Sequence, residues 1–569
     1  MQIIEQQEVV LGPPGCGKTH YLLDRVEELL SKGVPPDRIA FVSFTKKAVN
    51  EAIDRVCRRF NLKPGDLPYF RTVHSLCFRA LKMSKSDIMD RNAYFELGEL
   101  LGYKFEGTFD EAETGLPVGG EVGDKLLFTD NFARITCRPL REVWENEDTG
   151  LDWYELLRLS QALERFKDAK LLLDFTDLLT RFVQYNAPVQ VEAAIIDESQ
   201  DLSVLQWKVL QVAFANVSSC YIAGDDDQSI YKWSGADIGT FLSLKGRKTL
   251  LNQSYRIPRT VFKRAGEIIQ KVGNRFDKPF LPRDVEGFID VLPTIDYINI
   301  NQEETTLILV RNVFLLDRIA KILRNQGHPF MGRHGYSSIK HAHIDAIITW
   351  ENLRKGETVT GKQAKSLYSH MQVGTYLARG SKAAIDRLEN GERVTIDRLK
   401  ANYGLIGTAI WHEALEGIEL QMRAYYLSIL KSGRKLTAQP KISINTIHGV
   451  KGGEADHVII LPDMSSKTYA QFVSDPVDEH RVAYVAVTRA KERLSLILPS
   501  TPKAYSYSEK NMVARDLYTR TTSKGKTTVH HHRVWDADLF VKSLGKQLQK
   551  EDKAARFETI TEREYLNEK

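Results

Sequence analysis

Residues 9–20 read VVLGPPGCGKTH, a short apolar run that leads into a glycine-rich stretch. The stretch fits the pattern Gly-x-x-x-x-Gly-Lys-Thr, and the helix-like segment YLLDRVEELL follows at 21–30. Glycines let the backbone curl so that successive N–H groups point at phosphate oxygens, and the N-terminus of the following helix adds partial positive charge. This order of strand, loop and helix predicts a phosphate-binding loop.

Polar residues in this loop, and acids after another strand, predict phosphoryl-transfer chemistry. Lys18 can reach the terminal phosphates of a nucleotide, and Thr19 can ligate Mg²⁺. A second strand-like run ends in AAIIDESQD, residues 193–201. There Asp197 can hold Mg²⁺ through water, and Glu198 can polarise an attacking water. An acid that only caps the end of the strand is the alternative interpretation.

Short apolar runs recur along the chain and indicate the fold class. Such runs, when rich in β-branched residues and bounded by Gly, Pro or charge, predict buried parallel strands, and their alternation with helices predicts an α/β fold. The intervals 85–165 and 336–440 have a helical pattern instead, so we expect them to be insertions. The runs are VVL (9–11), IAFVSF (39–44), AAIID (193–197), CYIAGD (220–225), TLILVR (306–311), ISINTIH (442–448), HVIILP (457–462) and LSLILP (494–499).

Length and composition set broader limits. The 569 residues exceed what one hydrophobic core usually supports, so two to four domains are expected. A net charge of +5 is compatible with a nucleic-acid partner and equally with a balanced solvated surface. Five cysteines without a Cys-x-x-Cys pair argue against a disulfide framework or a zinc ribbon. Without an apolar run of roughly 18 residues or a signal-peptide pattern, we expect a soluble, cytoplasmic protein with no membrane partner.

A third stretch, GDDDQSIYKWSGAD at 224–237, places three acidic residues a few positions before two aromatic residues. Its three consecutive acids are compatible with a metal site or a solvated loop. Its alternating aromatics, Tyr231 and Trp233, are compatible with a core strand or with a surface that holds something flat. The residues of the stretch leave these alternatives open.

Several stretches, in their order along the chain, resemble the motifs of the UvrD/Rep/PcrA group of superfamily 1 DNA helicases. The resemblance covers most of residues 9–500. The stretches are GPPGCGKT (12–19), FTKKAVNEAIDR (44–55), TVHSLC (72–77), LLDFTDLL (172–179), DESQD (197–201), GDDDQSIYKWSGAD (224–237), LNQSYR (251–256), TIHGVKGGE (446–454) and YVAVTRAKERL (484–494).

This resemblance implies an α/β protein with two RecA-like parallel-sheet motor domains and ATP in the cleft between them. The first domain would span residues 1–250 with an insertion at about 85–165, and the second would span 251–500 with an insertion at about 336–440. Residues 501–569 would form a C-terminal extension. A bacterial or phage-infected cell would be the setting.

The resemblance also implies a nucleotide site for ATP and Mg²⁺, residue by residue. The catalytic set would be Lys18, Asp197, Glu198, Gln228 as the γ-phosphate sensor, and Arg256 and Arg489 as arginine fingers, with Thr19 and Asp197 on the metal. Tyr255 would stack on the adenine. The nucleotide contacts would be Gly12, Pro13, Pro14, Gly15, Cys16, Gly17, Lys18, Thr19, His20, Arg55, Tyr255 and Glu454. The family's helix with an adenine-reading Gln is not seen before Gly12, so adenine selectivity is not predicted.

Contacts with DNA are implied for a second set of residues. Bases of a single strand stack on aromatic side chains, at about 1–3 kcal/mol for each base. The residues implied are Phe44, Thr72, His74, Tyr231, Trp233 and His448. For Phe44 and Tyr231 the alternative is a core aromatic.

The function expected from the resemblance is an ATP-dependent DNA helicase that moves 3′→5′ on single-stranded DNA and unwinds duplex at single-strand/duplex junctions. The alternative is a single-stranded-DNA translocase that strips or remodels nucleoprotein and unwinds weakly. A P-loop kinase or GTPase would not need Arg256 and Arg489, and a non-catalytic DNA-binding module would not need the set Lys18, Asp197 and Glu198.

Overall fold

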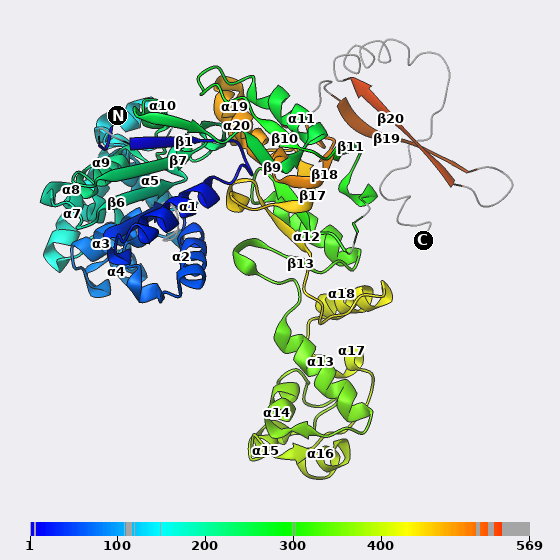
Figure 1. The fold of residues 1–569 in the computed structure, drawn as a ribbon. Helices are drawn as coiled ribbons and strands as arrows, with labels where there is room; N and C mark the ends of the chain where they lie inside the picture. Colours follow the sequence, from blue (N-terminus) through cyan, green and yellow to red (C-terminus); the bar gives the residue numbers. More distant parts are fainter. Residues whose placement is uncertain are drawn as a thin grey trace. The chain divides into compact units, whose positions relative to one another are not determined.

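Two compact units make up the chain in the computed structural model (Figure 1). The first comprises Met1–Gly287 and Gln471–Thr488, and the second comprises Phe288–Ala470 and Arg489–Lys569. Within the described part of the chain, no helix is long and apolar enough to cross a membrane. The structure describes residues 2–4, 7–106, 108–109, 117–118, 120–147, 149–298, 300–301, 303–507, 512–521 and 528–536.

A parallel sheet of six strands forms the centre of the first unit. Its order is β3-β2-β6-β7-β1-β8, and β2 and β6 are buried along their whole length, which explains why their sequences are continuously apolar rather than alternating. The four apolar runs predicted as strands in this part of the chain are confirmed. The strands are β1 (Gln7–Leu11), β2 (Ile39–Ser43), β3 (Phe70–Thr72), β6 (Ala193–Asp197), β7 (Ser219–Gly224) and β8 (Arg247–Leu250).

The strand order brings three functional stretches to one edge of this sheet. The register aligns Leu11 of β1 with Gly224 of β7, and β7 pairs on its other side with β6. Because all three strands are parallel, their carboxyl ends meet at the same edge, where open α/β sheets bind ligands. The glycine-rich loop, Asp197 and the turn after Gly224 therefore emerge side by side.

Several helices of the first unit begin directly after a side chain that caps them. α2 begins after Thr45, whose Oγ1 accepts a hydrogen bond from the Ala48 N–H at 3.2 Å. α20 comes from late in the chain and packs against α11. The helices are α1 (Lys18–Ser31), α2 (Lys46–Phe60), α3 (Val73–Ala80), α4 (Arg91–Leu101), α5 (Val122–Ile135), α6 (Leu140–Asn146), α7 (Trp153–Lys170), α8 (Phe175–Tyr185), α9 (Val204–Ala213), α10 (Ile238–Leu242), α11 (Arg259–Ile269) and α20 (Val477–Val487).

Two short strand pairs complete the first unit. β9 (Gln253–Pro258) and β10 (Leu281–Arg283) pair in parallel, and β4 (Thr108–Phe109) and β5 (Pro117–Val118) pair antiparallel. Helices α4, α5 and α7 bury an apolar cluster of their own, which includes Leu97, Leu126 and Leu159.

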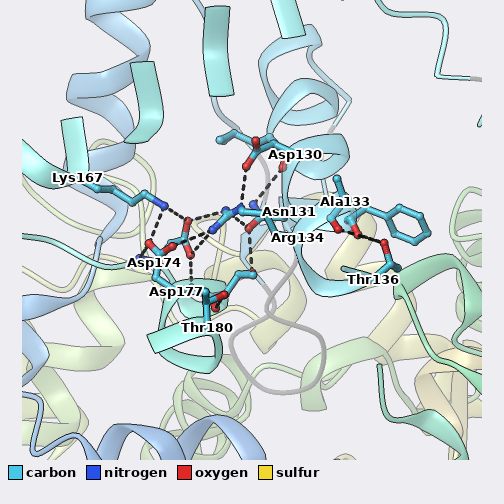
Figure 2. Close-up of polar contacts among 12 residues, drawn as sticks. Asp130, Asn131, Ala133, Arg134, Thr136, Lys167, Asp174, Asp177 and Thr180 are labelled. Atoms are coloured by element: carbon cyan, nitrogen blue, oxygen red, sulfur yellow. Dashed lines mark hydrogen bonds and ion pairs between the residues drawn. The ribbon is translucent and has the colours of Figure 1, made fainter. Parts of the chain in front are cut away.

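A network of buried charges joins α5, α7 and α8 (Figure 2). Asp174 lies between two cations: Arg134 Nη2 is 2.7 Å from its Oδ2, and Lys167 Nζ is 2.8 Å from the same atom. Arg134 also binds Asp130 at 2.9 Å and Asp177 at 3.0 Å. Burial alone would raise the pKa of Asp174, but Arg134 and Lys167 outweigh burial and hold this pKa below its usual value. Asp174 is therefore ionised, and its charge joins three helices.

The second unit has its own six-stranded parallel sheet, in the order β11-β18-β17-β12-β16-β13. The four apolar runs predicted as strands in this part of the chain are also confirmed, and with two parallel α/β sheets the predicted fold class is confirmed. The strands are β11 (Phe288–Leu292), β12 (Thr306–Val310), β13 (Phe330–Met331), β16 (Ile442–Thr446), β17 (Ala455–Leu461) and β18 (Ala490–Ile497).

Helices occupy the interval between β13 and β16 and bury a separate apolar core, which includes Trp350, Tyr368 and Tyr426 (Figure 1). Two antiparallel pairs, β14 (Val359–Thr360) with β15 (Arg393–Val394) and β19 (Met512–Thr521) with β20 (Thr528–Asp536), belong to this unit. The remaining helices are α12 (Leu315–Asn325), α13 (His341–Arg354), α14 (Gly361–Ser369), α15 (Ser381–Ile385), α16 (Ile396–Tyr403), α17 (Trp411–Ala414), α18 (Leu420–Lys431) and α19 (Ser466–Ser474), at which the chain returns to the first unit.

Replacing Asp174 by Asn should destabilise the first unit by about 3–5 kcal/mol, because the buried Lys167 and the partly buried Arg134 would lose the carboxylate that lies between them. The Asn side chain keeps an amide oxygen that can cap α8. The loss of stability therefore measures the lost charge pairing rather than a lost helix cap. Chemical unfolding followed by circular dichroism measures it. The matched control is Glu145→Gln in the exposed pair with Arg141, which should cost less than about 1 kcal/mol. Equal losses of stability in the two variants would contradict the role of Asp174 as the central partner of Arg134 and Lys167.

Candidate nucleotide and nucleic-acid site

The glycine-rich loop has the backbone conformation that a phosphate-binding loop needs. Gly15 and Gly17 have φ angles of +74° and +82°, a region that other residues rarely adopt. A Cβ on Gly15 would also lie 2.4 Å from Cβ of Arg256, so the close approach of these two segments requires glycine. Helix α1 begins at Lys18, directly after the loop. Its first N–H groups and those of the loop are the donors that a phosphate group would meet.

The side chain of Lys18 is buried and folds back against this loop. Its Nζ donates to the carbonyl oxygens of Gly12 at 2.7 Å and Pro13 at 3.2 Å. Burial opposes its charge, but Cys16, Asp225 and Glu198 outweigh burial and raise the pKa of Lys18 above its usual value. The ammonium group is therefore charged, as a group that binds phosphate must be.

Oxygen donors suited to a divalent cation stand next to Lys18. Thr19 Oγ1 donates to Oδ2 of the buried Asp197 at 2.7 Å. Burial first, and then the adjacent Glu198 carboxylate, raise the pKa of Asp197 to about 6. A buried carboxylate with a raised pKa would be stabilised by a cation, and hydroxyl and carboxylate oxygens are the ligands that Mg²⁺ prefers. Thr19 and Asp197 therefore fit a Mg²⁺ ion bound together with nucleotide phosphates.

Gln200 links the acid pair to the next strand, a role that sequence reasoning missed. Its side-chain Nε2 donates to Glu198 Oε2 at 2.6 Å, and its Oε1 accepts the Asp225 N–H at 3.0 Å. Glu198 itself has a φ of +51°, in the left-handed region. The amide thereby fixes the carboxylate that was predicted to polarise water. Its position within DESQD was the only signal in the sequence.

The three consecutive acids after β7 form buried ion pairs. Asp225, Asp226 and Asp227 are all buried, and Lys278 Nζ contacts a carboxylate oxygen of each. Arg275 binds Asp227 through two hydrogen bonds, of 2.8 and 2.6 Å. Among the residues that the structure describes, no group of three or more His, Cys, Asp or Glu could hold a metal. Because the three acids are inside the protein, the alternative of a solvated loop is wrong.

Gln228 contacts the first of these three acids, and the segment around Arg256 lies beside the glycine-rich loop. Gln228 Nε2 donates to Asp225 Oδ2 at 2.7 Å. The Tyr255 N–H donates to the Gly15 carbonyl at 2.8 Å, and the Tyr255 side chain is 71% exposed. Arg256 follows directly and packs its Cβ near Gly15, so both residues predicted from LNQSYR lie beside the phosphate loop.

His20 and Arg55 also come together. The Arg55 guanidinium donates to Nδ1 of His20, which is the first residue after Thr19. His20 in turn lies 3.8 Å from Asp24, one turn further along α1. The contact places both predicted nucleotide residues at the start of α1.

Three predicted residues belong to the second unit. Arg489 is buried, and its Nη1 donates to the Gly453 carbonyl at 3.2 Å. The Glu454 carboxylate lies 3.3 Å from Lys491 Nζ, and His448 begins a short 3₁₀ helix, η9 (His448–Val450). Their roles toward nucleotide or DNA remain predictions.

The three predicted base-stacking aromatics divide into two kinds. Phe44 and Tyr231 are only 6% and 4% exposed, with ring centroids 5.3 Å apart. Trp233 is 41% exposed, and its ring centroid lies 6.4 Å from that of Tyr231. The structure thus packs Phe44 and Tyr231 as core aromatics beneath Trp233, which alone of the three offers a large exposed aromatic surface.

Thr72 and His74 lie at the start of α3. Thr72 caps this helix, since its Oγ1 accepts the Ser75 N–H at 3.4 Å. The His74 ring meets Phe175 edge-on at 6.1 Å, and its Nε2 is buried without a hydrogen-bond partner among the described residues. Burial lowers the pKa of His74 to about 4, so the ring is neutral at pH 7 and offers no positive charge to a DNA phosphate.

Comparison with known proteins places this site in a family. Residues 1–249 match the UvrD/REP helicase N-terminal domain, and residues 408–501 match the UvrD-like helicase C-terminal domain. The ATP-dependent DNA helicase PcrA of Bacillus subtilis is 27% identical over 300 residues, which are 49% of this chain and 39% of that protein. The ATP-dependent DNA helicase Rep of Buchnera aphidicola is 23% identical over 337 residues, 54% of this chain and 47% of that protein.

YjcD of Bacillus subtilis is 26% identical over 325 residues, 53% of this chain and 41% of that protein. The matched region therefore spans less than half the length of each of these three relatives. Both the N-terminal and the C-terminal helicase domains are matched, at the positions that carry the phosphate loop and the buried Arg489. The chain belongs to the UvrD/REP helicase family.

Proposed function

We propose that this protein is an ATP-dependent DNA helicase that moves 3′→5′ along single-stranded DNA and separates duplex at single-strand/duplex junctions. The observation that carries the proposal is the set of Lys18, Thr19, Asp197 and Glu198 at one sheet edge, from which the turn that carries the exposed Trp233 also emerges. Relatives named as ATP-dependent DNA helicases support the same reaction.

On the nucleotide side, the chain's own residues would bind and orient the triphosphate. Lys18 and the N–H groups of the loop would neutralise the phosphates. Thr19 and Asp197 would hold Mg²⁺, which supplies charge neutralisation on the β- and γ-phosphates. Glu198, fixed by Gln200, would accept a proton from the attacking water. Its exposure is intermediate, so a water can reach it.

On the DNA side, Trp233 would stack on a base of the single strand. Phe44 and Tyr231 would act beneath it by holding its position. Gln228, which would sense the γ-phosphate, precedes Trp233 by five residues in the same turn. A movement of Gln228 at the phosphate would therefore reach the stacking surface through only five residues of backbone.

We further propose that each unit is a motor domain with a helical insertion, and that Arg256 and Arg489 stabilise the transition state of hydrolysis. A guanidinium beside the γ-phosphate neutralises charge that develops during phosphoryl transfer. Arg256 is supported by its approach to Gly15. Arg489 is supported by its place in YVAVTRAKERL.

The wild-type protein should hydrolyse ATP in the presence of Mg²⁺, faster with single-stranded DNA, and should displace a strand from 3′-tailed but not 5′-tailed duplex. Steady-state hydrolysis and a strand-displacement assay measure both. Lys18→Ala should lower kcat by at least about a hundredfold, because it removes a preorganised positive charge from the phosphates. Hydrolysis that DNA does not stimulate would contradict the proposal, and stimulation without displacement would favour a translocase that remodels nucleoprotein.

Trp233→Ala should leave basal ATP hydrolysis within about twofold of wild type and should weaken binding of single-stranded DNA by roughly 5- to 150-fold, the loss of one stacked base. Fluorescence anisotropy of a labelled oligonucleotide measures the affinity. Tyr154→Ala is the matched control, because it removes an aromatic side chain that is 78% exposed on α7. Wild-type DNA affinity in the Trp233 variant would show that the stacking surface is elsewhere.

A further inference from the structure

A single buried ammonium group holds the three acids that follow β7. Lys278 Nζ lies 2.7 Å from Asp225 Oδ1 and 3.0 Å from Asp227 Oδ2, and it also contacts Asp226. The Lys278 side chain is only 2% exposed. Buried carboxylates are costly without a cation, and Lys278 is the cation that contacts all three, so the turn depends on this residue.

The residues around Lys278 hold the same turn at further points. The Phe276 N–H donates to Asp226 Oδ2 at 2.8 Å. Arg481, which is buried on α20, donates to the Asp226 carbonyl at 3.0 Å and to the Asn274 carbonyl at 3.2 Å. With the bidentate pair of Arg275, the segment 274–278 and α20 fix the turn through both its side chains and its backbone.

Asp225 connects this fixed turn to the proposed hydrolysis site. Its Oδ1 binds Lys278 and its Oδ2 accepts the Gln228 amide at 2.7 Å. Its N–H donates to Gln200, which also holds Glu198. Burial alone would raise the pKa of Asp225, but Lys278, and then Lys18, outweigh it and hold this pKa below its usual value. Asp225 is therefore a charged acceptor, which binds an amide more strongly than a neutral carboxyl does.

We propose that Lys278 is a positioning residue for nucleotide hydrolysis: by fixing the Asp225 carboxylate, it orients the Gln228 amide toward the terminal phosphate. This inference rests on the proposed function, in which Gln228 senses that phosphate. Lys278 does not touch the nucleotide in this account. Its effect reaches the phosphate through Asp225 and Gln228, so it should alter how the protein distinguishes a triphosphate from a diphosphate.

The test compares the affinities for fluorescent ADP and for a fluorescent, non-hydrolysable ATP analogue. Lys278→Met keeps an unbranched side chain, one atom shorter, but removes its charge. We expect the preference for the ATP analogue over ADP to fall by about tenfold, the effect of losing one charge-assisted hydrogen bond at the sensor. Affinity for ADP should stay within about twofold of wild type.

A double-mutant cycle tests whether Lys278 acts through Gln228. Gln228→Ala should reduce the same preference, and the double variant Lys278→Met/Gln228→Ala should lose no more than either single variant. The matched control is Lys167→Met, which removes another buried lysine that binds two aspartates. It should lower the thermal midpoint and leave the nucleotide preference unchanged. If Lys278→Met does not fold, Asp225→Asn takes its place in the cycle with the same expected loss.

The outcomes separate this inference from the proposed function. A protein that binds neither nucleotide and hydrolyses no ATP would overturn both. Wild-type hydrolysis together with an unchanged nucleotide preference in Lys278→Met, or additive losses in the cycle, would overturn only the positioning role. A reduced preference in Lys167→Met as well would also overturn it, because loss of any buried lysine would then suffice.

Discussion

The pairing of buried charges at the carboxyl edge of the first sheet is the constraint on which this structure depends. A phosphate-binding site needs charged side chains at a place from which water is largely excluded, and each such charge is costly without a partner. Lys18 is balanced by carbonyl oxygens and nearby acids, and Asp225 is balanced by Lys278. The pKa of Asp197 is raised, so a bound cation would stabilise the ionised form of this carboxylate.

The same constraint explains why acids and aromatics stand together in GDDDQSIYKWSGAD. The acid side chains hold the turn to the segment 274–278, and the backbone carbonyl of Asp226 holds it to α20. With its start fixed in this way, the turn packs Tyr231 against Phe44 and leaves Trp233 at the surface. In the proposed function, the residue that senses the nucleotide and the residue that stacks on DNA are therefore parts of one well-anchored turn. This anchoring is what would convert a change at a phosphate into a movement at a base.

A second charge network, around Asp174, joins α5 and α7 to the start of α8. It uses the stretch LLDFTDLL, which precedes Asp197 in the chain and contributes Phe175 to the contact with His74. Both networks join segments that are far apart in sequence. In each, a buried aspartate is kept ionised by two or more cations, so the charges fix an arrangement that apolar packing alone would leave less specific.

The sequence alone determined the strands, the phosphate loop and the positions of Lys18, Thr19, Asp197 and Glu198, because these follow from local patterns: apolar runs, glycine spacing and an acid at a strand end. It could not determine whether Phe44 and Tyr231 lie in the core, since what covers each ring comes from segments that are distant in the sequence. Nor could it find Lys278 and Arg275 as partners of the three acids. Those pairs join residues 48 to 53 positions apart, and only the tertiary structure decides which charges meet when a buried carboxylate requires a cation.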